Sequence, residues 1–283
     1  MPDADPIFLR KRLSTQLQAA RKEAGFSQPN VAEAMVWSLS KVMRLESGRV
    51  KISITDLRAL IDFYGLSKEK ASELLASAQE ARRQPWWHEY RQLLSEGFQS
   101  YLGYEASASV IRNFEALYIP GLLQTEEYAR TVLDQSVVPE KDDLLELRMR
   151  RQERVIHQSS GVELNFLIDE SALRRVVGST AIMEAQLEYL ATMNDLPHVS
   201  VGVIPFAAGL YPLLRSPYVI FEFASPEQDR VVYLENPDGS VILRDKATVG
   251  VHRSIEEYLE SFWEVENQFA LPVNEWRSSP QAA

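Results

Sequence analysis

Three hydrogen-bonding side chains lie close together in the N-terminal part of this sequence, and their types limit the chemistry that they could do. Ser40, Lys41 and Arg44 carry a hydroxyl, an ammonium and a guanidinium group, with no acidic residue between them. Such groups donate hydrogen bonds to phosphate oxygens and to the acceptor atoms of base edges. To bind a polyanion, they need an element that turns all three outward together.

The spacing of the apolar residues around them predicts that element. Counting from Gln28 as position 1, the small residue Ala32 falls at position 5, Val42 at 15 and Leu45 at 18. A small residue lets two helices cross closely, and the two later positions attach the second helix to a core. Ser38 stands where it can cap that second helix. We therefore expect a helix-turn-helix whose second helix presents its first two turns outward.

Further polar and basic residues flank the predicted second helix. Gln28, Arg49 and Lys51 stand where they could hold phosphates on either side of a groove, and a helix fits the major groove of B-DNA. The same pattern is also compatible with an antiparallel helix pair whose basic face is only solvated. Both interpretations remain open on the pattern alone.

The charge of the chain is distributed unevenly. The net charge of −10 speaks against a nucleic-acid partner, yet residues 10–58 hold ten Lys and Arg against four Asp and Glu. Residues 84–283 hold sixteen Lys and Arg against thirty Asp and Glu. A basic block on an acidic body suggests a localised site for a polyanion.

The composition also excludes some kinds of protein and site. There is no cysteine, which rules out disulfides, thiolate metal sites and a cysteine nucleophile and fits a reducing compartment. No apolar run approaches the ~18 residues of a membrane helix, and the N-terminus has no signal-peptide core. We therefore expect a cytoplasmic protein.

The residue pattern predicts two domains and a tail. Helical periodicity runs over five short segments up to about residue 83, and Pro85 is a natural boundary. Beyond it we predict helices over 86–134 with a break at Ile119–Gly121, and over 142–158, 180–194 and 254–270. We predict strands over 162–169, 199–206, 218–223 and 230–236. The expected architecture is an all-α five-helix domain over 8–83, a mixed α+β domain with a small, mostly antiparallel sheet over 84–275, and a flexible tail over 276–283.

Residues 10–66 resemble the Cro/repressor-type helix-turn-helix family, also called the xenobiotic-response-element (XRE) family. The resemblance rests on Gln28, which opens the first motif helix, and on the run "SLSKVMRLESG". It implies a lambda-repressor-like fold in which Glu46 braces the interior. It also implies base-reading roles for Leu39, Ser40, Lys41 and Arg44, and phosphate contacts for Gln28, Ser38, Arg49 and Lys51. Leu39 could touch a thymine methyl group or could instead pack against the turn.

One residue of the turn departs from that family. Position 9 usually holds glycine because the backbone there favours positive φ, but this chain has Val36. Positive φ is costly for a β-branched residue. Either the turn takes another shape or it carries strain of ~1 kcal/mol or more.

The second domain resembles the C-terminal domain of WhiJ-like, antitoxin-like actinobacterial regulators. The resemblance rests on the strings "WWHEYRQLL", "YEASASVIRNFEALYIPGLLQTEEYARTVL" and "VIPF". It implies a transcriptional regulator, often encoded beside a small partner protein. The segment "YIPGLLQT" could be a partner-binding loop or a buried corner of the fold.

Signals for catalysis are weak, and we predict neither an enzyme nor a cofactor. The four histidines are scattered without metal-ligand spacing, and the phosphate-loop, dinucleotide and nucleophile-elbow motifs are absent. The aromatic residues Trp86, Trp87 and Tyr90 could line a ligand or partner site or form a hydrophobic clamp between domains.

These observations favour a sequence-specific DNA-binding transcriptional regulator. Since one helix-turn-helix covers only about half a turn of groove, we expect a homodimer on a two-fold operator. The second domain would then dimerise, sense a ligand or dock a partner. Two alternatives stay open, an antitoxin-like module that neutralises a small partner protein and uses DNA binding for autoregulation, and an enzyme with an appended DNA-binding domain.

Overall fold

The computed structural model describes residues 5–136, 138–158, 161–212, 214, 216–224, 230–236, 239–244 and 254–279. The chain divides into two units, Asp3–His88 and Glu89–Ala283, which are described separately below.

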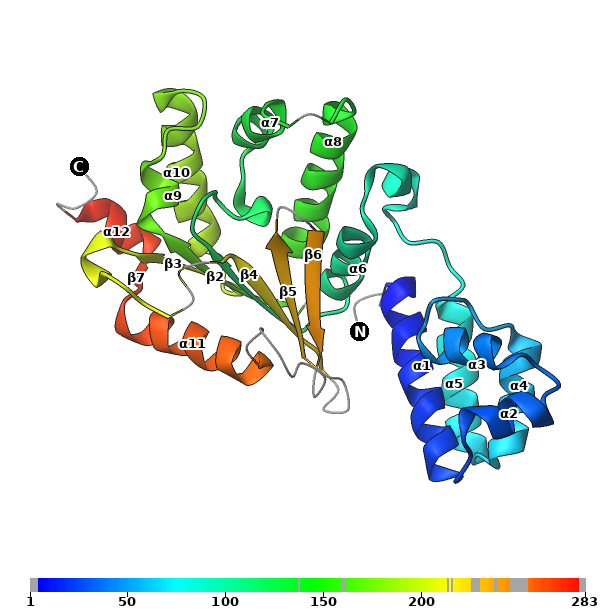
Figure 1. Ribbon diagram of the computed structural model, residues 1–283. Helices are drawn as coiled ribbons and strands as arrows, with labels where there is room; N and C mark the ends of the chain where they lie inside the picture. Colours follow the sequence, from blue (N-terminus) through cyan, green and yellow to red (C-terminus); the bar gives the residue numbers. More distant parts are fainter. Residues whose placement is uncertain are drawn as a thin grey trace. The chain divides into compact units, whose positions relative to one another are not determined.

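The N-terminal unit is built from the five helices that the sequence predicts (Figure 1). They are α1 (Pro6–Glu23), α2 (Gln28–Ala34), α3 (Leu39–Glu46), α4 (Ile54–Tyr64) and α5 (Lys68–Glu80). A serine caps each of the last four, since the side chains of Ser27, Ser38, Ser53 and Ser67 accept a hydrogen bond from a backbone N–H of the first turn. Gly65 ends α4 in the left-handed conformation.

One apolar core joins these helices. Leu17 of α1, Val31 of α2, Val42 of α3, Leu57 of α4 and Leu74 of α5 are all buried in it. The helices α2, α3 and α4 have only 7, 8 and 11 residues and are too short to be stable in water alone, so their order comes from this shared burial. Among the residues described, the N-terminal unit contains no strand.

The C-terminal unit contains a seven-stranded sheet in the order β6-β5-β4-β1-β2-β3-β7. The strands are β1 (Val110–Glu115), β2 (Glu163–Asp169), β3 (Val199–Ile204), β4 (Tyr218–Glu222), β5 (Val231–Asn236), β6 (Gly239–Arg244) and β7 (Leu271–Pro272). The β1–β2 and β2–β3 pairs are parallel, and the other four pairs are antiparallel.

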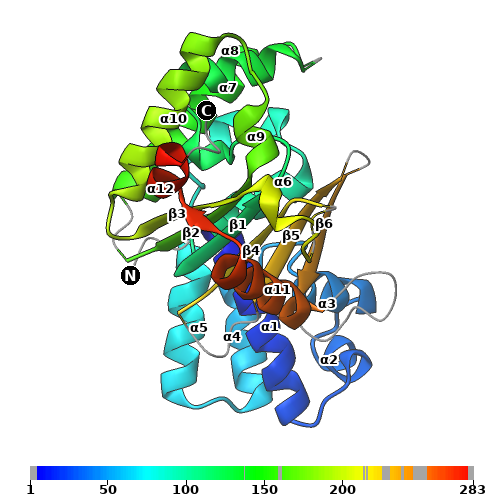
Figure 2. The ribbon, with the colours of Figure 1, turned by 90° about the vertical axis from the view of Figure 1, so that its left-hand side faces the viewer.

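Helices cover both faces of this sheet (Figures 1 and 2). On one face lies α11 (Ile255–Gln268), whose Tyr258, Leu259 and Phe262 pack against inward residues of β1 and β4. The helices of the other side are α6 (Glu96–Glu105), α7 (Glu126–Asp134), α8 (Lys141–Gln152), α9 (Glu170–Arg174) and α10 (Thr180–Asn194). Short helical turns, η1 (His88–Leu93), η2 (Gly121–Leu123), η3 (Glu153–Gln158) and η4 (Phe206–Ala208), connect these elements.

The sheet corrects the predicted one in size and pairing. It is a seven-stranded, partly parallel sheet rather than a small, mostly antiparallel one. The strand β1 was expected to be helical. It lies between β2 and β4, and helices cover both faces of the sheet (Figures 1 and 2), so the run "VIRNFE" shows no period-two alternation. β6 and β7 were also not predicted.

The end of the chain differs from the expected tail as well. Helix α12 (Val273–Ser278) covers the start of the segment 276–283, and Trp276 within it is buried. Residues 280–283 of that predicted tail lie outside the described residues.

Candidate nucleic-acid interface

The predicted helix-turn-helix is formed by α2, a four-residue connection and α3. Ala32, Val42 and Leu45 are buried as the spacing requires. The hydroxyl of Ser38 accepts a hydrogen bond from the backbone N–H of Lys41 at 3.2 Å, which caps α3. The helix therefore begins where the sequence predicts, and its opposite side is free to face outward.

The turn between α2 and α3 has the positive φ that favours glycine, although it holds a valine. Val36 has φ of 55°, and it is the one non-glycine residue with positive φ within the described residues. Its side chain is 91% exposed, so no packing offsets the strain. The second of the two alternatives for this turn, a strained turn of the usual shape, is therefore the one observed.

We expect Val36→Gly to raise the free energy of unfolding by about 1 kcal/mol, which is the relief of left-handed strain less the extra entropy of an unfolded glycine. Thermal unfolding of the full chain measures this as a rise of a few degrees in Tm. Val176→Gly is the matched control, because Val176 is also exposed but lacks positive φ. A fall in Tm for Val36→Gly would contradict the strain.

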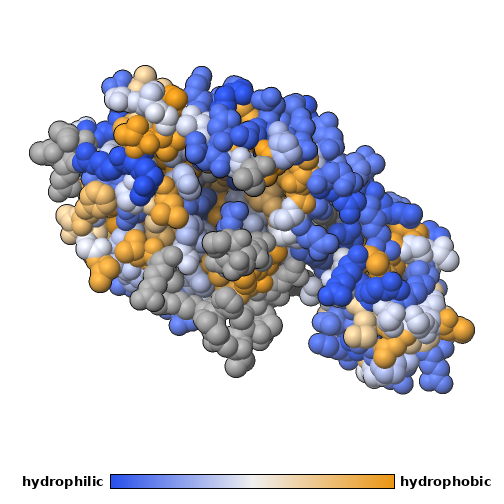
Figure 3. All heavy atoms as spheres, turned by 45° about the horizontal axis from the view of Figure 1, so that its top comes forward, coloured by the Kyte–Doolittle hydropathy of each residue, from blue (hydrophilic) through white to orange (hydrophobic). Residues whose placement is uncertain are grey.

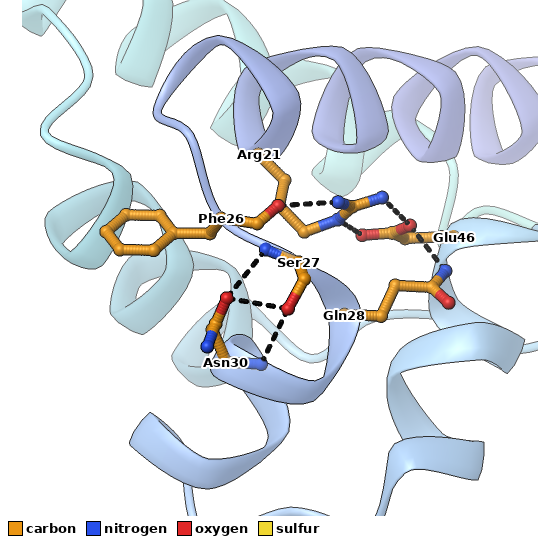
Figure 4. Close-up of polar contacts among 6 residues, drawn as sticks. All are labelled: Arg21, Phe26, Ser27, Gln28, Asn30 and Glu46. Atoms are coloured by element: carbon orange, nitrogen blue, oxygen red, sulfur yellow. Dashed lines mark hydrogen bonds and ion pairs between the residues drawn. The ribbon is translucent and has the colours of Figure 1, made fainter.

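A buried ion pair holds α1, α2 and α3 together (Figure 4). Arg21 donates from Nε and Nη2 to the two carboxylate oxygens of Glu46, at 2.6 and 2.9 Å, and from Nη1 to the carbonyl of Phe26 at 2.7 Å. Gln28 donates from Nε2 to the same carboxylate at 2.8 Å. Glu46 therefore occupies the interior position that was expected for it. The hydrogen bonds and charge of Glu46 raise the pKa of Arg21.

The structure gives Gln28 a role that sequence reasoning missed. The amide of Gln28 was predicted to contact phosphate. It instead donates a hydrogen bond from α2 to the carboxylate of Glu46 on α3. The spacing between Gln28 and Glu46 carries no local signal for this contact, since the two residues stand on different helices. Any phosphate contact by Gln28 would have to use its remaining amide atoms.

The four predicted base-reading residues divide into two groups. Leu39, Ser40 and Arg44 are exposed on α3. Lys41 is only half-exposed, because its Nζ lies 3.1 Å from a carboxylate oxygen of Asp56 and 3.7 Å above the ring centroid of Trp37. The structure thus places Leu39, Ser40 and Arg44 on one exposed surface. The fourth residue, Lys41, is paired with Asp56 of the same unit.

Met43 belongs to the same exposed surface and was not predicted. Its side chain is 52% exposed and that of Leu39 is 43% exposed. The two residues are four positions apart, so they lie one above the other on the same face of α3. The four-residue spacing of Leu39 and Met43 was the signal that could have found this pair. It was ambiguous, because apolar residues at this spacing can face the core or the solvent.

The predicted phosphate-contacting residues surround this surface. Ser38 stands at the first turn of α3, and its hydroxyl is already used in the cap. Arg49 and Lys51 are exposed in the connection between α3 and α4. Within the described part of the chain, neither cation lies in an ion pair, so both charges are available to an anion.

The three aromatic residues do not form one cluster within a single unit. Trp87 is buried in the N-terminal unit, where its indole N–H donates to Asp5 at 3.2 Å, and Trp86 is half-buried. Tyr90 belongs to the C-terminal unit, where the guanidinium carbon of Arg150 lies 5.7 Å from its ring centroid.

Two other kinds of site are absent from the described residues. No group of three or more potential metal-ligating side chains was found among the residues described. No helix in the described part of the chain combines the length and apolar character needed to cross a membrane.

Comparison with known families assigns both parts of the chain. Residues 12–74 match a helix-turn-helix domain. Residues 98–262, more than half of the chain, match a domain of unknown function, DUF5753. The chain belongs to the DUF5753 family. No curated protein and no solved structure matched the chain.

A buried ion pair anchors α6 to α8 in the DUF5753 domain. Arg151 donates from Nε to both carboxylate oxygens of Glu105, at 2.8 and 2.9 Å, and from Nη2 to the hydroxyl of Tyr101 at 3.1 Å. These groups satisfy one another, which is the condition under which a buried charge is tolerated.

The loop between β1 and α7 is the segment of the DUF5753 domain for which two interpretations were open. Ile119, Leu122 and Leu123 are buried in it, so most of "YIPGLLQT" is a corner of the fold. Gln152 and Gln186 donate to its backbone carbonyls. Leu117, just before this segment, and Tyr118, its first residue, are exposed.

Two ionisable residues of the DUF5753 domain, Glu115 and Arg148, are half-buried. Burial, and secondarily the charge of Glu235, raise the pKa of Glu115 to about 8. Burial lowers the pKa of Arg148 to about 10, and its guanidinium donates to the side chain of Gln124. Neither lies in an ion pair with any described residue. Near neutral pH, Glu115 is therefore mainly protonated.

Proposed function

We propose that this chain is a sequence-specific DNA-binding transcriptional regulator of the Cro/repressor (XRE) type with a lambda-repressor-like N-terminal domain. The observation that carries the proposal is the outward surface of α3. A capped helix presents Ser40 and Arg44, and it is followed by Arg49 and Lys51, two cations that make no ion pair within the described residues. A helix of this kind fits the major groove, and flanking cations position it on the phosphates.

The roles of individual residues follow from their contacts. We assign base reading to Leu39, Ser40 and Arg44, and phosphate contact to Ser38, Arg49 and Lys51. Lys41 can reach a base only by leaving Asp56 and Trp37, so we assign it to positioning α3. Gln28 acts on α3 in the same way through Glu46.

We further propose a homodimer on a two-fold operator, acting in the cytoplasm without a catalytic step. One helix-turn-helix contacts about half a turn of groove, and tight specific binding usually needs two. The DUF5753 domain would supply dimerisation or the sensing of a ligand or partner, in the manner of the WhiJ-like regulators.

A second function is favoured by one feature of the DUF5753 domain. Large apolar side chains are exposed after the carboxyl ends of all three parallel strands, namely Leu117 and Tyr118 after β1, Val176 after β2, and Phe206 and Leu210 after β3. The carboxyl ends of parallel strands lie at the same end of a sheet, so we expect these side chains to lie near one another, and contiguous exposed apolar residues mark interaction sites. An antitoxin-like module that binds a small partner protein would use such a surface.

Selection from a random DNA pool by the full-length protein tests the main proposal. We expect a palindromic consensus, with log K falling steeply against log[salt] as phosphate contacts release counterions. Failure to enrich any sequence, with weak binding lost at physiological salt, would contradict it. Capture of the product of a neighbouring gene by the full chain, lost on Leu117→Ala with Leu210→Ala, would favour the second function.

On the selected site, Arg44→Ala should weaken binding by ~1–3 kcal/mol and relax specificity at one position, because a guanidinium can bind guanine through two hydrogen bonds. Arg49→Ala or Lys51→Ala should instead weaken binding to all sequences alike and reduce the salt slope by about 1. Titrations against the selected site and a scrambled duplex measure both. Equal sequence dependence of Arg44→Ala and Arg49→Ala would refute this division of roles.

A further inference from the structure

The outward surface of α3 is half apolar, whereas interfaces with DNA are more polar and more positively charged than those between proteins. Hydrophobic side chains reach the surface of the N-terminal unit among hydrophilic ones (Figure 3). On α3 they are Leu39 and Met43, 43% and 52% exposed, beside Ser40 and Arg44. The buried residues of this helix, Val42 and Leu45, lie on its other side. The two apolar side chains are thus not needed for the core.

The cationic part of this surface is smaller than the sequence suggests. α3 holds two cations, and Lys41 is drawn to Asp56 and Trp37 at 3.1 and 3.7 Å. Arg44 remains, and its Nε–H donates to the carbonyl of Ser40 at 3.2 Å. Its two terminal nitrogens make no hydrogen bond within the described residues, so they are free for a two-bond contact with a guanine edge.

In the major groove, the group that an apolar side chain can contact is the C5-methyl group of thymine. Leu39 and Met43 are four residues apart, about 6 Å along the helix axis, which corresponds to about two base-pair steps of 3.4 Å. A helix lying along the groove could therefore cover two methyl groups at neighbouring or next-but-one positions. Burying each methyl adds apolar contact that no other base provides.

We infer that α3 reads its operator largely through thymine methyl groups, which contact Leu39 and Met43, next to one guanine bound by Arg44. This inference rests on the proposed DNA-binding function and names the kind of half-site that the function uses. Specificity then comes from removing apolar surface from water as well as from hydrogen bonds.

Replacement of thymine by uracil in the selected operator tests the inference, because it deletes only the methyl group and leaves base pairing unchanged. Full-length protein should bind the uracil half-site about four-fold more weakly for each contacted methyl group. The double variant Leu39→Ala, Met43→Ala should bind the thymine and uracil duplexes equally. Both residues are exposed, so circular dichroism should show the variant folded.

A matched control separates the guanine contact from the methyl contacts. Arg44→Ala should keep the preference for thymine over uracil, yet become insensitive to replacing guanine by 7-deazaguanine, which lacks the N7 acceptor. Equal affinity of the unmodified protein for the thymine and uracil operators would overturn the inference while leaving specific DNA binding intact. Failure to select any operator would instead overturn the proposed function, and this inference with it.

Discussion

Glu46→Ala is expected to lower the free energy of unfolding of the N-terminal unit by about 3–5 kcal/mol, because it leaves a buried guanidinium without its counter-ion. The side chains of Arg21 and Glu46 are only 8% and 5% exposed. Arg21 loses two of its three hydrogen bonds in the variant, and Gln28 loses its acceptor on α3. The contact between α2 and α3 should loosen, and DNA binding should fall with it.

Hydrogen exchange of the full chain, read by mass spectrometry over α1 to α5, measures this loss within the N-terminal unit. Glu73→Ala is the matched control. Glu73 also pairs with a cation, Lys70 at 3.5 Å, but on an exposed helix surface, where the expected cost is at most about 1 kcal/mol. Replacing both buried partners, as Arg21→Met with Glu46→Leu, should recover much of the loss. Equal losses in the free energy of unfolding for Glu46→Ala and Glu73→Ala would show that the buried ion pair stabilises the unit no more than an exposed one.

Glu115→Gln is expected to stabilise the DUF5753 domain at alkaline pH and to change little in acid. The pKa of Glu115 is raised from 4.5 to about 8, first by burial and then by Glu235. A raised folded pKa contributes stability that is complete below the unfolded pKa and is lost as pH rises through the folded pKa. Stability therefore falls as the pH rises from about 4.5 to 8, because the unfolded carboxyl ionises in this range while the folded one keeps its proton. The total loss is on the order of 2–4 kcal/mol.

Thermal or urea unfolding of the protein and the variant at pH 5 and pH 9 measures the difference. The variant should match the parent at pH 5 and exceed it at pH 9. Glu235→Gln is the control for the second cause, and it should raise stability at pH 9 by a smaller amount because burial is the larger cause. A variant that is no more stable than the parent at pH 9 would mean that water or another group solvates the ionised carboxylate.

Some parts of this interface could be read from the sequence because their signals are local. Ser38 caps α3 through an interaction within a few residues, whereas the sequence left two shapes open for the turn at Val36 and the structure chose the strained one. Helix-turn-helix spacing likewise depends on a few positions, Ala32, Val42 and Leu45, that are close in the chain. The interior position of Glu46 was expected from the resemblance to the Cro/repressor-type family, and not from the local sequence pattern.

Other parts were decided by residues that are far apart in the sequence. Lys41 appeared to be a base-reading cation until the fold placed Asp56 beside it, fifteen residues later in the chain. The direction in which the pair Leu39 and Met43 points was also undetermined, since four-residue spacing fits a core stripe as well as an outward one.

The sequence by itself determined the five-helix N-terminal unit, the caps at Ser38 and Ser67, and the four strands with clear β-rich runs. Only the tertiary structure decided that β1 is a strand, because a central strand whose two faces are both covered by helices shows no alternation. It also decided which charges face solvent and which are neutralised inside. Both depend on long-range contacts, which a local pattern does not encode.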